Sequence, residues 1–496
     1  MFKNYKNLGF NNPYYFKKNG NFVIKSNLST LLDEYDSLRK IDPVAIIEIL
    51  NKTYILGDRT IIEGIQKTPW LSKPNKDNNN WEYDKIPKHG QLNLSEQEIA
   101  HTLFQKICSE LQLYIGNKTQ VGILLSGGMD SRMVAGALDY LLKKNKLPQA
   151  IEVTALTWGN IDSRDVIYAK EIANRLNWKW KHYTVTAKDL LNNISETAIH
   201  GCEYSPIHLH AIPQVRDDNA NLEVILAGSY GDSVGRAEYG GWKLKFLKPF
   251  LSKMINFSSI INQDVFDNSL CYVESDVKSY HTKFPEKELY AQNELDYQLH
   301  YMRRWLNPCM ELLNEKSEFY QVFTHPDVYS YMWSLLPERR NDLVYKYMYN
   351  DFVTKLDDIP WARTGFPYGE KEGKPDNLKK DHHSYVKIIK TEIFDDITSA
   401  INSGSLKKLG IFNLRAIKKL IFLLKLFPSN NLFFYEKLIF LASISKMVNI
   451  YKIEGIKNEN IKSSNRNFEL LEHLYYRVRQ SAAPILKKYI QKIKNS

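Results

Sequence analysis

The chain has 496 residues, of which 43% are hydrophobic and 25% charged, and its formal net charge is +11. This composition excludes a disordered polypeptide, and the length is sufficient for two or three folded domains. No run of about 18 apolar residues occurs, which excludes a membrane-spanning helix. The four cysteines, Cys108, Cys202, Cys271 and Cys309, are widely separated, which favours reduced thiols over disulfides or a zinc site.

Residues 1–92 are expected to form a small α+β unit. Short strands are predicted at Asn21–Ile24 and Thr53–Leu56, and helical periodicity covers Pro43–Leu50. The first ten residues, MFKNYKNLGF, lack the apolar core of a secretory signal, so we expect a cytoplasmic protein. A helix at Leu94–Leu113 follows, with a serine in the N-cap position.

The most informative stretch is Val121–Leu138, VGILLSGGMDSRMVAGAL. Its apolar start predicts a buried strand, Ser126–Gly128 form a turn, and helical spacing resumes at Met129. A strand, a glycine turn and a helix in this order point backbone N–H groups at an anion. Asp130 would repel a phosphate unless a cation lay between them, which indicates Mg²⁺. The lysine of a Walker A loop is missing, so this is another class of phosphate loop.

Further strands and helices alternate after this loop. An amphipathic helix is predicted at 162–176. Strands are predicted at Ala150–Leu156, Lys181–Val185 and Leu222–Leu226. The alternation predicts an α/β fold with a doubly wound parallel sheet and helices on both faces.

Two motifs resemble a known family. The loop SGGMDS, Ser126–Ser131, resembles the SGGxDS pyrophosphate loop of ATP pyrophosphatases, which adenylate a substrate and release pyrophosphate. Among these enzymes the chain resembles the synthetase domain of asparagine synthetases and of their relatives, β-lactam synthetase and lasso-peptide cyclase. The stretch AGSYGDSVGR, 227–236, resembles the G-E-G-x-D-E signature of asparagine synthetases. The resemblance covers roughly Asp42 to Phe366 and is strongest at the loop.

This resemblance implies an ATP site at the carboxyl edge of the sheet. The residues expected to bind ATP and pyrophosphate are Leu125, Ser126, Gly127, Gly128, Asp130, Ser131, Leu156, Thr157 and Gly228. Asp130 and Asp232 would hold Mg²⁺, since two carboxylates at the ends of neighbouring strands suit a hard cation. Leu156 and Thr157 would lie against adenine, although ordinary sheet core explains either one equally well.

The general base of the family is replaced in this sequence. Ser229 stands where the glutamate is expected, and a serine is not a base near neutral pH. Tyr230 and Glu203 are the candidate replacements. Glu203 belongs to the polar segment Glu196–His210, and stray polar residues in a loop are the simpler interpretation of that segment.

The catalytic lysine of the family is also missing. The segment IPWARTGF resembles the stretch that carries an arginine and a lysine which neutralises the phosphates. Arg363 fits the arginine, whereas Thr364 or Gly365 stands at the lysine position. Arg363, or Lys371 or Lys374 in the following loop, could supply positive charge, although solvated loop charge is the simpler interpretation of the two lysines.

The segment ILGDRTIIEGIQKTPW, 55–70, resembles the end of the glutaminase domain of asparagine synthetases. That glutaminase uses an N-terminal cysteine as its nucleophile, whereas this sequence begins Met1-Phe2. The resemblance therefore implies a truncated remnant without glutaminase activity. Nitrogen would then come from ammonia, from a separate glutaminase or from an amine on a substrate.

We divide the chain into a truncated glutaminase-like unit at 1–92, an ATP pyrophosphatase domain at 93–378 and a helical extension at 379–496. The extension carries much of the positive charge, in Lys407, Lys408, Arg415, Lys418, Lys419, Lys425, Lys487, Lys488, Lys492 and Lys494. Solvated helix faces are one explanation of this charge. A docking surface for an anionic substrate, an anionic lipid or a partner is the other.

The sequence thus favours an ATP-dependent ligase that joins a small-molecule or peptide carboxylate to ammonia or an amine, with ATP and Mg²⁺ as cofactors. Two alternatives remain open at this point. One is another adenylating ATP pyrophosphatase, such as an RNA-modifying thiolase, although no cysteine pair is present to carry sulfur and we expect no nucleic-acid partner. The other is a descendant that binds a nucleotide or partner without catalysis, which the changes at Ser229 and Thr364 motivate.

Overall fold

A five-stranded parallel sheet forms the centre of one half of the molecule, in the order β10-β9-β6-β7-β8. Its strands are β6 (Gln120–Leu124), β7 (Glu152–Trp158), β8 (Lys179–Tyr183), β9 (Val224–Ala227) and β10 (Glu318–Gln321). The computed structural model describes residues 8, 12–35, 39–75, 77–148, 150–236, 243–244, 247–251, 253–370 and 377–456. The inner strands are almost wholly buried, as is usual for a parallel sheet.

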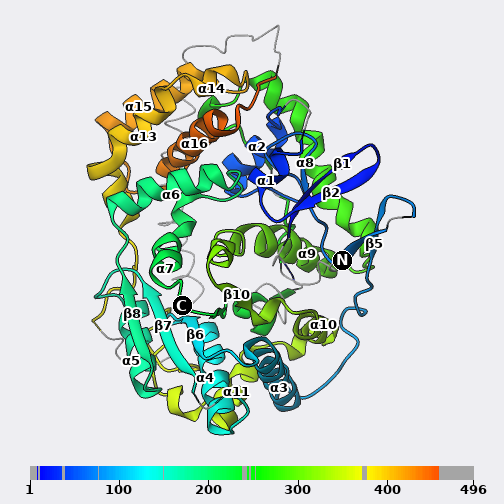
Figure 1. The fold of residues 1–496 in the computed structure, drawn as a ribbon, viewed down its shortest axis with the longest axis vertical. Helices are drawn as coiled ribbons and strands as arrows, with labels where there is room; N and C mark the ends of the chain where they lie inside the picture. The colour runs from blue at the N-terminus through cyan, green and yellow to red at the C-terminus, as the bar shows by residue number, and fades with distance from the viewer. Residues whose placement is uncertain are drawn as a thin grey trace, which may run out of the picture.

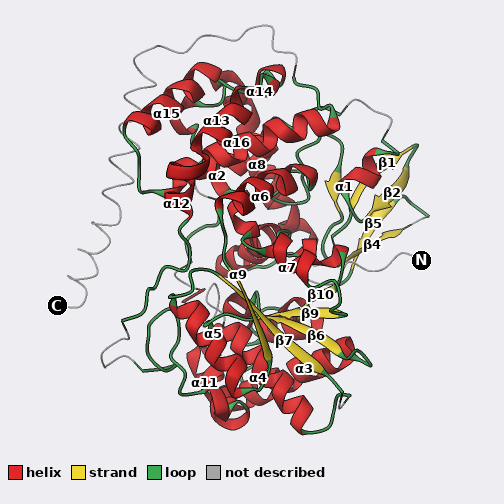
Figure 2. Ribbon diagram, turned by 60° about the vertical axis from the view of Figure 1, so that its left-hand side comes forward, coloured by secondary structure: helices red, strands yellow, loops and turns green. Residues whose placement is uncertain are grey.

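Helices cover both faces of this sheet, which confirms the predicted doubly wound α/β fold (Figure 2). One face carries α3 (Glu96–Ile115), α4 (Met129–Lys143), α5 (Arg164–Arg175) and α11 (Asp342–Phe352). The other carries α7 (Ile212–Asp218). Helix α9 (Leu289–Asp296) packs against the segment that follows it, Tyr297–Leu306. Helix α3 begins at a complete capping box, in which Ser95 and Glu98 bond to each other's backbone N–H groups.

The strand order reverses between β6 and β9. From β6 the chain builds β7 and β8 toward one edge, and β9 and β10 then extend the sheet on the other side of β6. In this register Leu124 pairs with Leu156 on one side and with Ala227 on the other. Ligands of open parallel sheets bind outside the carboxyl ends of the strands at such a switch point.

The N-terminal part forms an antiparallel sheet in the order β2-β1-β3 and a separate hairpin. Its elements are β1 (Tyr14–Lys18), β2 (Asn21–Lys25), α1 (Leu28–Leu32), α2 (Pro43–Lys52), β3 (Gln66–Lys67), β4 (Ser72–Asn75) and β5 (Asn80–Tyr83). The predicted strand at Thr53–Leu56 is wrong. Only Tyr54 forms a bridge there, to Tyr204, because Thr53 has a left-handed backbone and ends α2.

Arginine side chains join this N-terminal part to the rest of the molecule. Arg303 and Arg304 both donate to the Gly57 carbonyl oxygen, and Arg304 also donates to the Arg59 carbonyl. Both arginines belong to a π-helical segment, Tyr297–Leu306, which continues α9. The long helix α8 (Gln263–Lys283) packs against α2.

The described C-terminal region is helical and lies beside α6 (Ala187–Ile199), at the opposite end of the molecule from the sheet (Figure 1). Its helices are α12 (Tyr385–Ile388), α13 (Phe394–Asn402), α14 (Ser405–Lys408), α15 (Leu414–Leu426) and α16 (Leu432–Tyr451). Most residues of α16 are buried, because the helix packs against α6, α13 and α14. A shorter helix, α10 (Pro326–Ser334), packs against α3. None of the described helices combines the length and hydropathy that crossing a bilayer requires.

Candidate functional site

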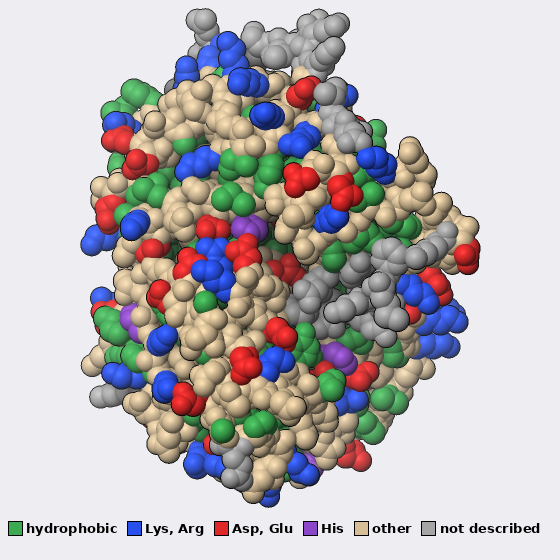
Figure 3. Space-filling model, viewed as in Figure 1, with side chains coloured by type: hydrophobic (Ala, Val, Ile, Leu, Met, Phe, Trp, Pro, Cys, Tyr) green, Lys and Arg blue, Asp and Glu red, His purple; other side chains and the backbone are tan. Residues whose placement is uncertain are grey.

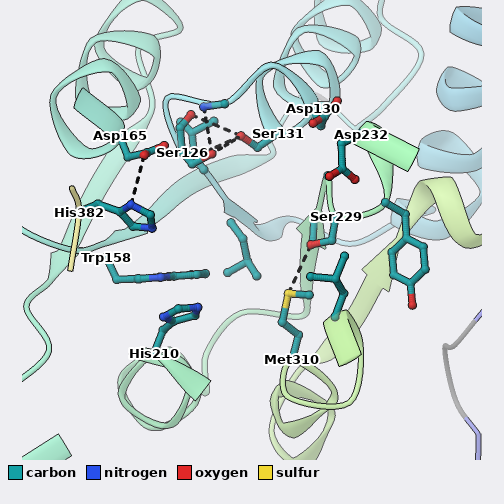
Figure 4. Close-up of a pocket in the computed structure, with 17 residues that line it drawn as sticks. Ser126, Asp130, Ser131, Trp158, Asp165, His210, Ser229, Asp232, Met310 and His382 are labelled. Carbon is teal, nitrogen blue, oxygen red and sulfur yellow. Dashed lines mark hydrogen bonds and ion pairs between the residues drawn. The ribbon is translucent and has the colours of Figure 1, made fainter. Parts of the chain in front are cut away.

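A cavity of about 330 Å³ opens at the carboxyl ends of β6, β7 and β9, at the switch point of the sheet (Figure 4). It is lined by Leu124, Leu125, Ser126, Gly128, Asp130, Ser131, Trp158, Asp165, His210, Ala227, Gly228, Ser229, Tyr230, Asp232, Leu306, Met310 and His382. The predicted loop and the predicted second motif therefore meet in one place.

Hydroxyl groups hold the loop after β6 in its turn. The Ser126 N–H donates to Ser131 Oγ over 3.2 Å, and the Gly128 N–H donates to Ser126 Oγ over 3.1 Å. Helix α4 then begins with Gly128 as its N-cap, and no described side chain caps it there. The first-turn N–H groups of a helix have no partner within the helix, so this end can bind an anion.

Two glycines bring the second motif against the start of α4. A Cβ atom at Gly228 would lie 2.5 Å from the Ser131 nitrogen and 2.6 Å from the Asp130 carbonyl carbon. At Gly231 it would lie 2.4 Å from the Asp130 Cβ. Because both positions lack a side chain, Asp232 comes to the same cavity as Asp130.

Replacing Gly231 with alanine is therefore expected to displace Asp130. Overpacking of this kind costs about 1–3 kcal/mol of folding free energy, and it should also weaken binding of MgATP. Thermal unfolding and titration with a fluorescent ATP analogue would measure the two effects. The neighbouring Ser229→Ala change is the control, because it removes only a 3.4 Å contact with the Met310 sulfur. Equal stability and affinity in the two variants would contradict the prediction.

An arginine that the sequence analysis missed pairs with Asp130. The Arg236 Nε and Nη2 atoms donate to the two oxygens of Asp130, each over 2.9 Å. Burial acts against the charged guanidinium, but Asp130 outweighs it and the pKa of Arg236 is raised. The rings of Tyr345 and Trp361 lie against the guanidinium, at 5.9 and 5.2 Å from their centroids. The sequence feature that could have indicated this pair is the position of Arg236, four residues after Asp232 in the second motif.

The two carboxylates form a donor set that suits Mg²⁺. Asp130 and Asp232 supply hard oxygen atoms, and each carboxylate oxygen of Asp130 keeps a lone pair beyond its bond to Arg236. Mg²⁺ commonly binds one or two carboxylates together with substrate phosphates, which fits a pair of carboxylates beside a phosphate loop. Among the described residues, the group of three potential metal ligands, Glu110, His325 and Asp327, does not line the cavity.

The sequence of the region containing these features matches a known family. Residues 115–237, which include both motifs, match the family model described as asparagine synthase. This segment is therefore similar in sequence to that family. Its sequence is also similar to the glutamine-hydrolysing asparagine synthetase of Rattus norvegicus, with 26% identity over 121 residues. The match covers 23% of this chain and spans only 21% of the rat protein.

Solved structures show limited likeness. The U34-tRNA thiolase of Methanococcus maripaludis, solved with its [4Fe-4S] cluster, aligns with 77% of this chain and 92% of its own, at 13% identity and a TM-score of 0.27. The NMN synthetase of Francisella tularensis aligns with 37% of this chain and 72% of its own, at 15% identity and a TM-score of 0.20.

Some of the predicted nucleotide-binding residues do not line the cavity. Leu156 and Thr157 are buried in β7, and the Thr157 hydroxyl donates to the Leu125 carbonyl. Gly127 faces away, since a Cβ there would meet Ala362 at 2.9 Å. The residue of β7 that does reach the cavity is Trp158. The adenine contact of Leu156 and Thr157 stays a prediction.

Aromatic and histidine side chains form the wall opposite the loop. The Trp158 and His210 rings stack with centroids 5.8 Å apart (Figure 4). The His210 Nδ1 lies 2.6 Å from the Tyr385 hydroxyl. Burial, with nearby His383, lowers the pKa of His210 well below its ordinary value, so this imidazole is neutral at pH 7. Trp158, His210 and Tyr385 were not among the predicted site residues, although His210 ends the polar segment Glu196–His210 that the sequence singled out.

A second unpredicted pair closes the cavity beside the loop. The Nδ1 atom of His382 lies 3.6 Å from a carboxylate oxygen of Asp165. Burial raises the pKa of Asp165, and the neighbouring His382 opposes this shift. Because His382 follows residue 378, the proposed extension contributes to the site, and the division at that residue stays a prediction.

The predicted replacement bases are not placed for that role in the structure. The Tyr230 hydroxyl is buried and donates to the Met302 carbonyl over 2.6 Å, so only other parts of this residue face the cavity. Glu203 does not line the cavity. It is buried beside the N-terminal part, where its carboxylate lies 3.1 Å from Arg304 and 3.8 Å from Lys67.

Arg363 is exposed and lies outside the lining of the cavity. Its guanidinium is 4.8 Å from the Trp361 ring centroid. Lys371 and Lys374, the other predicted sources of positive charge, lie outside the described residues. Among the described residues, Arg236 supplies positive charge beside the predicted metal ligands, because it pairs with Asp130.

A buried arginine ties the loop to the segment that precedes Arg363. Arg132, in α4, has no exposed surface, and its guanidinium donates to four carbonyl oxygens. These belong to Gly127 of the loop and to Leu356, Ile359 and Pro360. The Ala362 N–H also donates to the Gly127 carbonyl, over 3.1 Å. The shape of the loop therefore depends on residues that are far away in the sequence.

Proposed function

We propose that this protein is an ATP-dependent ligase that adenylates a substrate carboxylate and then forms an amide. The observation that carries the proposal is the meeting of the Ser126–Ser131 loop with Asp130 and Asp232 in one cavity. An anion-binding helix N-terminus beside two carboxylates suits a nucleoside triphosphate with its metal ion. The asparagine synthase-like segment supports the same assignment.

In the first step, an oxygen of the substrate carboxylate attacks the α-phosphorus of ATP. The bond between the α-phosphorus and its bridging oxygen breaks, and pyrophosphate leaves as the acyl-adenylate forms. The loop amides and the Ser126 hydroxyl would hold the β- and γ-phosphates and stabilise the leaving group. Asp130 and Asp232 would hold Mg²⁺, which supplies neutralisation of phosphate charge when it is bound.

In the second step, a nitrogen nucleophile attacks the acyl carbon, loses a proton, and displaces AMP to give the amide. Ser229 is no base for this step, since its hydroxyl donates to the Met310 sulfur. We propose that the nitrogen arrives as free ammonia, from a separate glutaminase or as an amine already on a substrate. The carboxylate belongs to a small molecule or a peptide, and the reaction takes place in the cytoplasm, where ATP is plentiful.

Exchange of labelled pyrophosphate into ATP tests the first step alone, because it needs no nitrogen donor. The purified chain would be incubated with ATP, Mg²⁺, labelled pyrophosphate and pools of carboxylates. We expect label in ATP only with a pool that contains the substrate, and none with the Asp130→Asn variant. Binding of ATP without exchange in any pool would favour the alternative of a non-catalytic descendant.

A further inference from the structure

Helix α15 exposes an unusual face at the end of the molecule farthest from the sheet (Figure 1). Phe422 and Phe427 are each 60% exposed and Leu426 is 54% exposed, whereas the other large exposed apolar side chains are scattered along the described chain. Lys418 and Lys425 are also exposed. Helical spacing places positions 418, 422, 425 and 426 on one side of α15, and Phe427 is the C-cap residue that follows the helix. These five residues are called the α15 face below.

The opposite side of the same helix is fully used in packing. Its buried residues are Ala416, Ile417, Leu420 and Leu424. The helix is therefore anchored to the fold by one apolar stripe and presents a second one outward. The exposed Phe422, Leu426 and Phe427 side chains therefore do not contribute to the described core.

The sequence around the α15 face is rich in basic residues. The sequence between Ile397 and Tyr435 contains no Asp or Glu, and its basic residues are Lys407, Lys408, Arg415, Lys418, Lys419 and Lys425. At this end of the molecule, blue basic side chains lie near green apolar ones, with some red acidic side chains among them (Figure 3). Lys425 lies 3.3 Å from Asp395 of α13, but both side chains are mostly exposed, so this pair holds the lysine weakly.

We propose that the α15 face is a docking surface for an anionic lipid bilayer. A helix that lies in a membrane interface inserts Phe and Leu side chains between lipids while flanking lysines contact the anionic headgroups. A nucleic acid would use the lysines but would leave three large apolar side chains in water. The charge pattern therefore favours an anionic partner, and the apolar side chains favour a lipid surface among such partners.

Flotation of the full chain with vesicles tests this surface directly. Vesicles of phosphatidylcholine alone would be compared with vesicles that contain an equal part of phosphatidylglycerol, at low and high salt. We expect binding to the anionic vesicles, weakened by salt because salt screens the lysines. The triple change Phe422→Ser, Leu426→Ser and Phe427→Ser, and the double change Lys418→Glu and Lys425→Glu, should each lower binding at least about tenfold.

A matched control lies at the start of α9. Lys287 is exposed and Leu289 is 66% exposed, so the pair Lys287→Glu and Leu289→Ser changes the same residue types elsewhere and should bind like the parent. Thermal unfolding would establish that every variant is folded. Failure of the parent to float with anionic vesicles would overturn the proposal. So would binding that the α15 changes leave intact, RNA binding that only the lysine changes abolish, or self-association lost in the serine variant.

Discussion

Replacing Asp130 with asparagine is expected to lower pyrophosphate release at least about a thousandfold, because the change removes a carboxylate from the predicted Mg²⁺ pair. The same change leaves the buried Arg236 without its two bonds to this carboxylate. We therefore also expect lower thermal stability, since breaking a buried ion pair leaves an uncompensated charge. Pyrophosphate release and thermal unfolding would be measured on the same preparation.

A second substitution separates chemistry from folding. Changing Arg236 to methionine together with Asp130→Asn removes both charges, which should restore much of the stability without restoring pyrophosphate release. Asp139→Asn is the matched control, because Asp139 lies on the same helix and pairs with Lys143 at the surface. The role given to Asp130 would be refuted by a folded Asp130→Asn variant that releases pyrophosphate at the parent rate.

Replacing Arg132 with methionine is expected to lower the free energy of unfolding by about 3–5 kcal/mol, because it removes charge-assisted hydrogen bonds to buried carbonyl groups. Arg132 has no exposed surface, and its four acceptors include the Gly127 carbonyl of the predicted phosphate loop. Loss of this tie should also weaken ATP binding. Urea unfolding and titration with a fluorescent ATP analogue would measure the two effects.

Two further substitutions serve as comparisons for the stability of Arg132→Met. Arg132→Lys keeps a positive charge but reaches fewer carbonyl groups. Its free energy of unfolding should therefore lie between those of the parent and of Arg132→Met. Arg175→Met is the surface control, since Arg175 pairs with Glu171 and Asp358 and should cost about 1 kcal/mol or less. An Arg132→Met variant as stable as the Arg175→Met variant would show that the buried tie contributes nothing.

The central fold followed from the sequence because its signals are local. Alternating apolar strands and amphipathic helices marked β6 to β9 within a few residues, and the parallel sheet is confirmed. The edge strand β10 was not predicted, because Glu318–Gln321 is only four residues long and carries no distinctive pattern. Among the described strands it pairs with β9. Thr53–Leu56 has the composition of a strand, but the preceding helix end left it without a sheet partner.

The candidate site was predictable where it rests on a contiguous motif. Ser126, Gly128, Asp130, Ser131, Gly228 and Asp232 all line one cavity. Residues that reach the cavity through tertiary packing were not predictable, since Trp158, His210 and His382 belong to no common motif. Glu203 was predicted as a candidate base but does not reach the cavity. Its position among polar residues in the sequence did not reveal that it is buried beside Arg304.

The central claim is that this chain converts ATP and a carboxylate into an acyl-adenylate and pyrophosphate. The most direct measurement follows AMP and pyrophosphate together in a reaction with ATP, Mg²⁺, ammonium and pools of carboxylates. We expect equal amounts of the two products, formed only with a particular carboxylate and absent with Asp130→Asn. Formation of ADP and phosphate instead, or no binding of ATP to the folded chain, would contradict it.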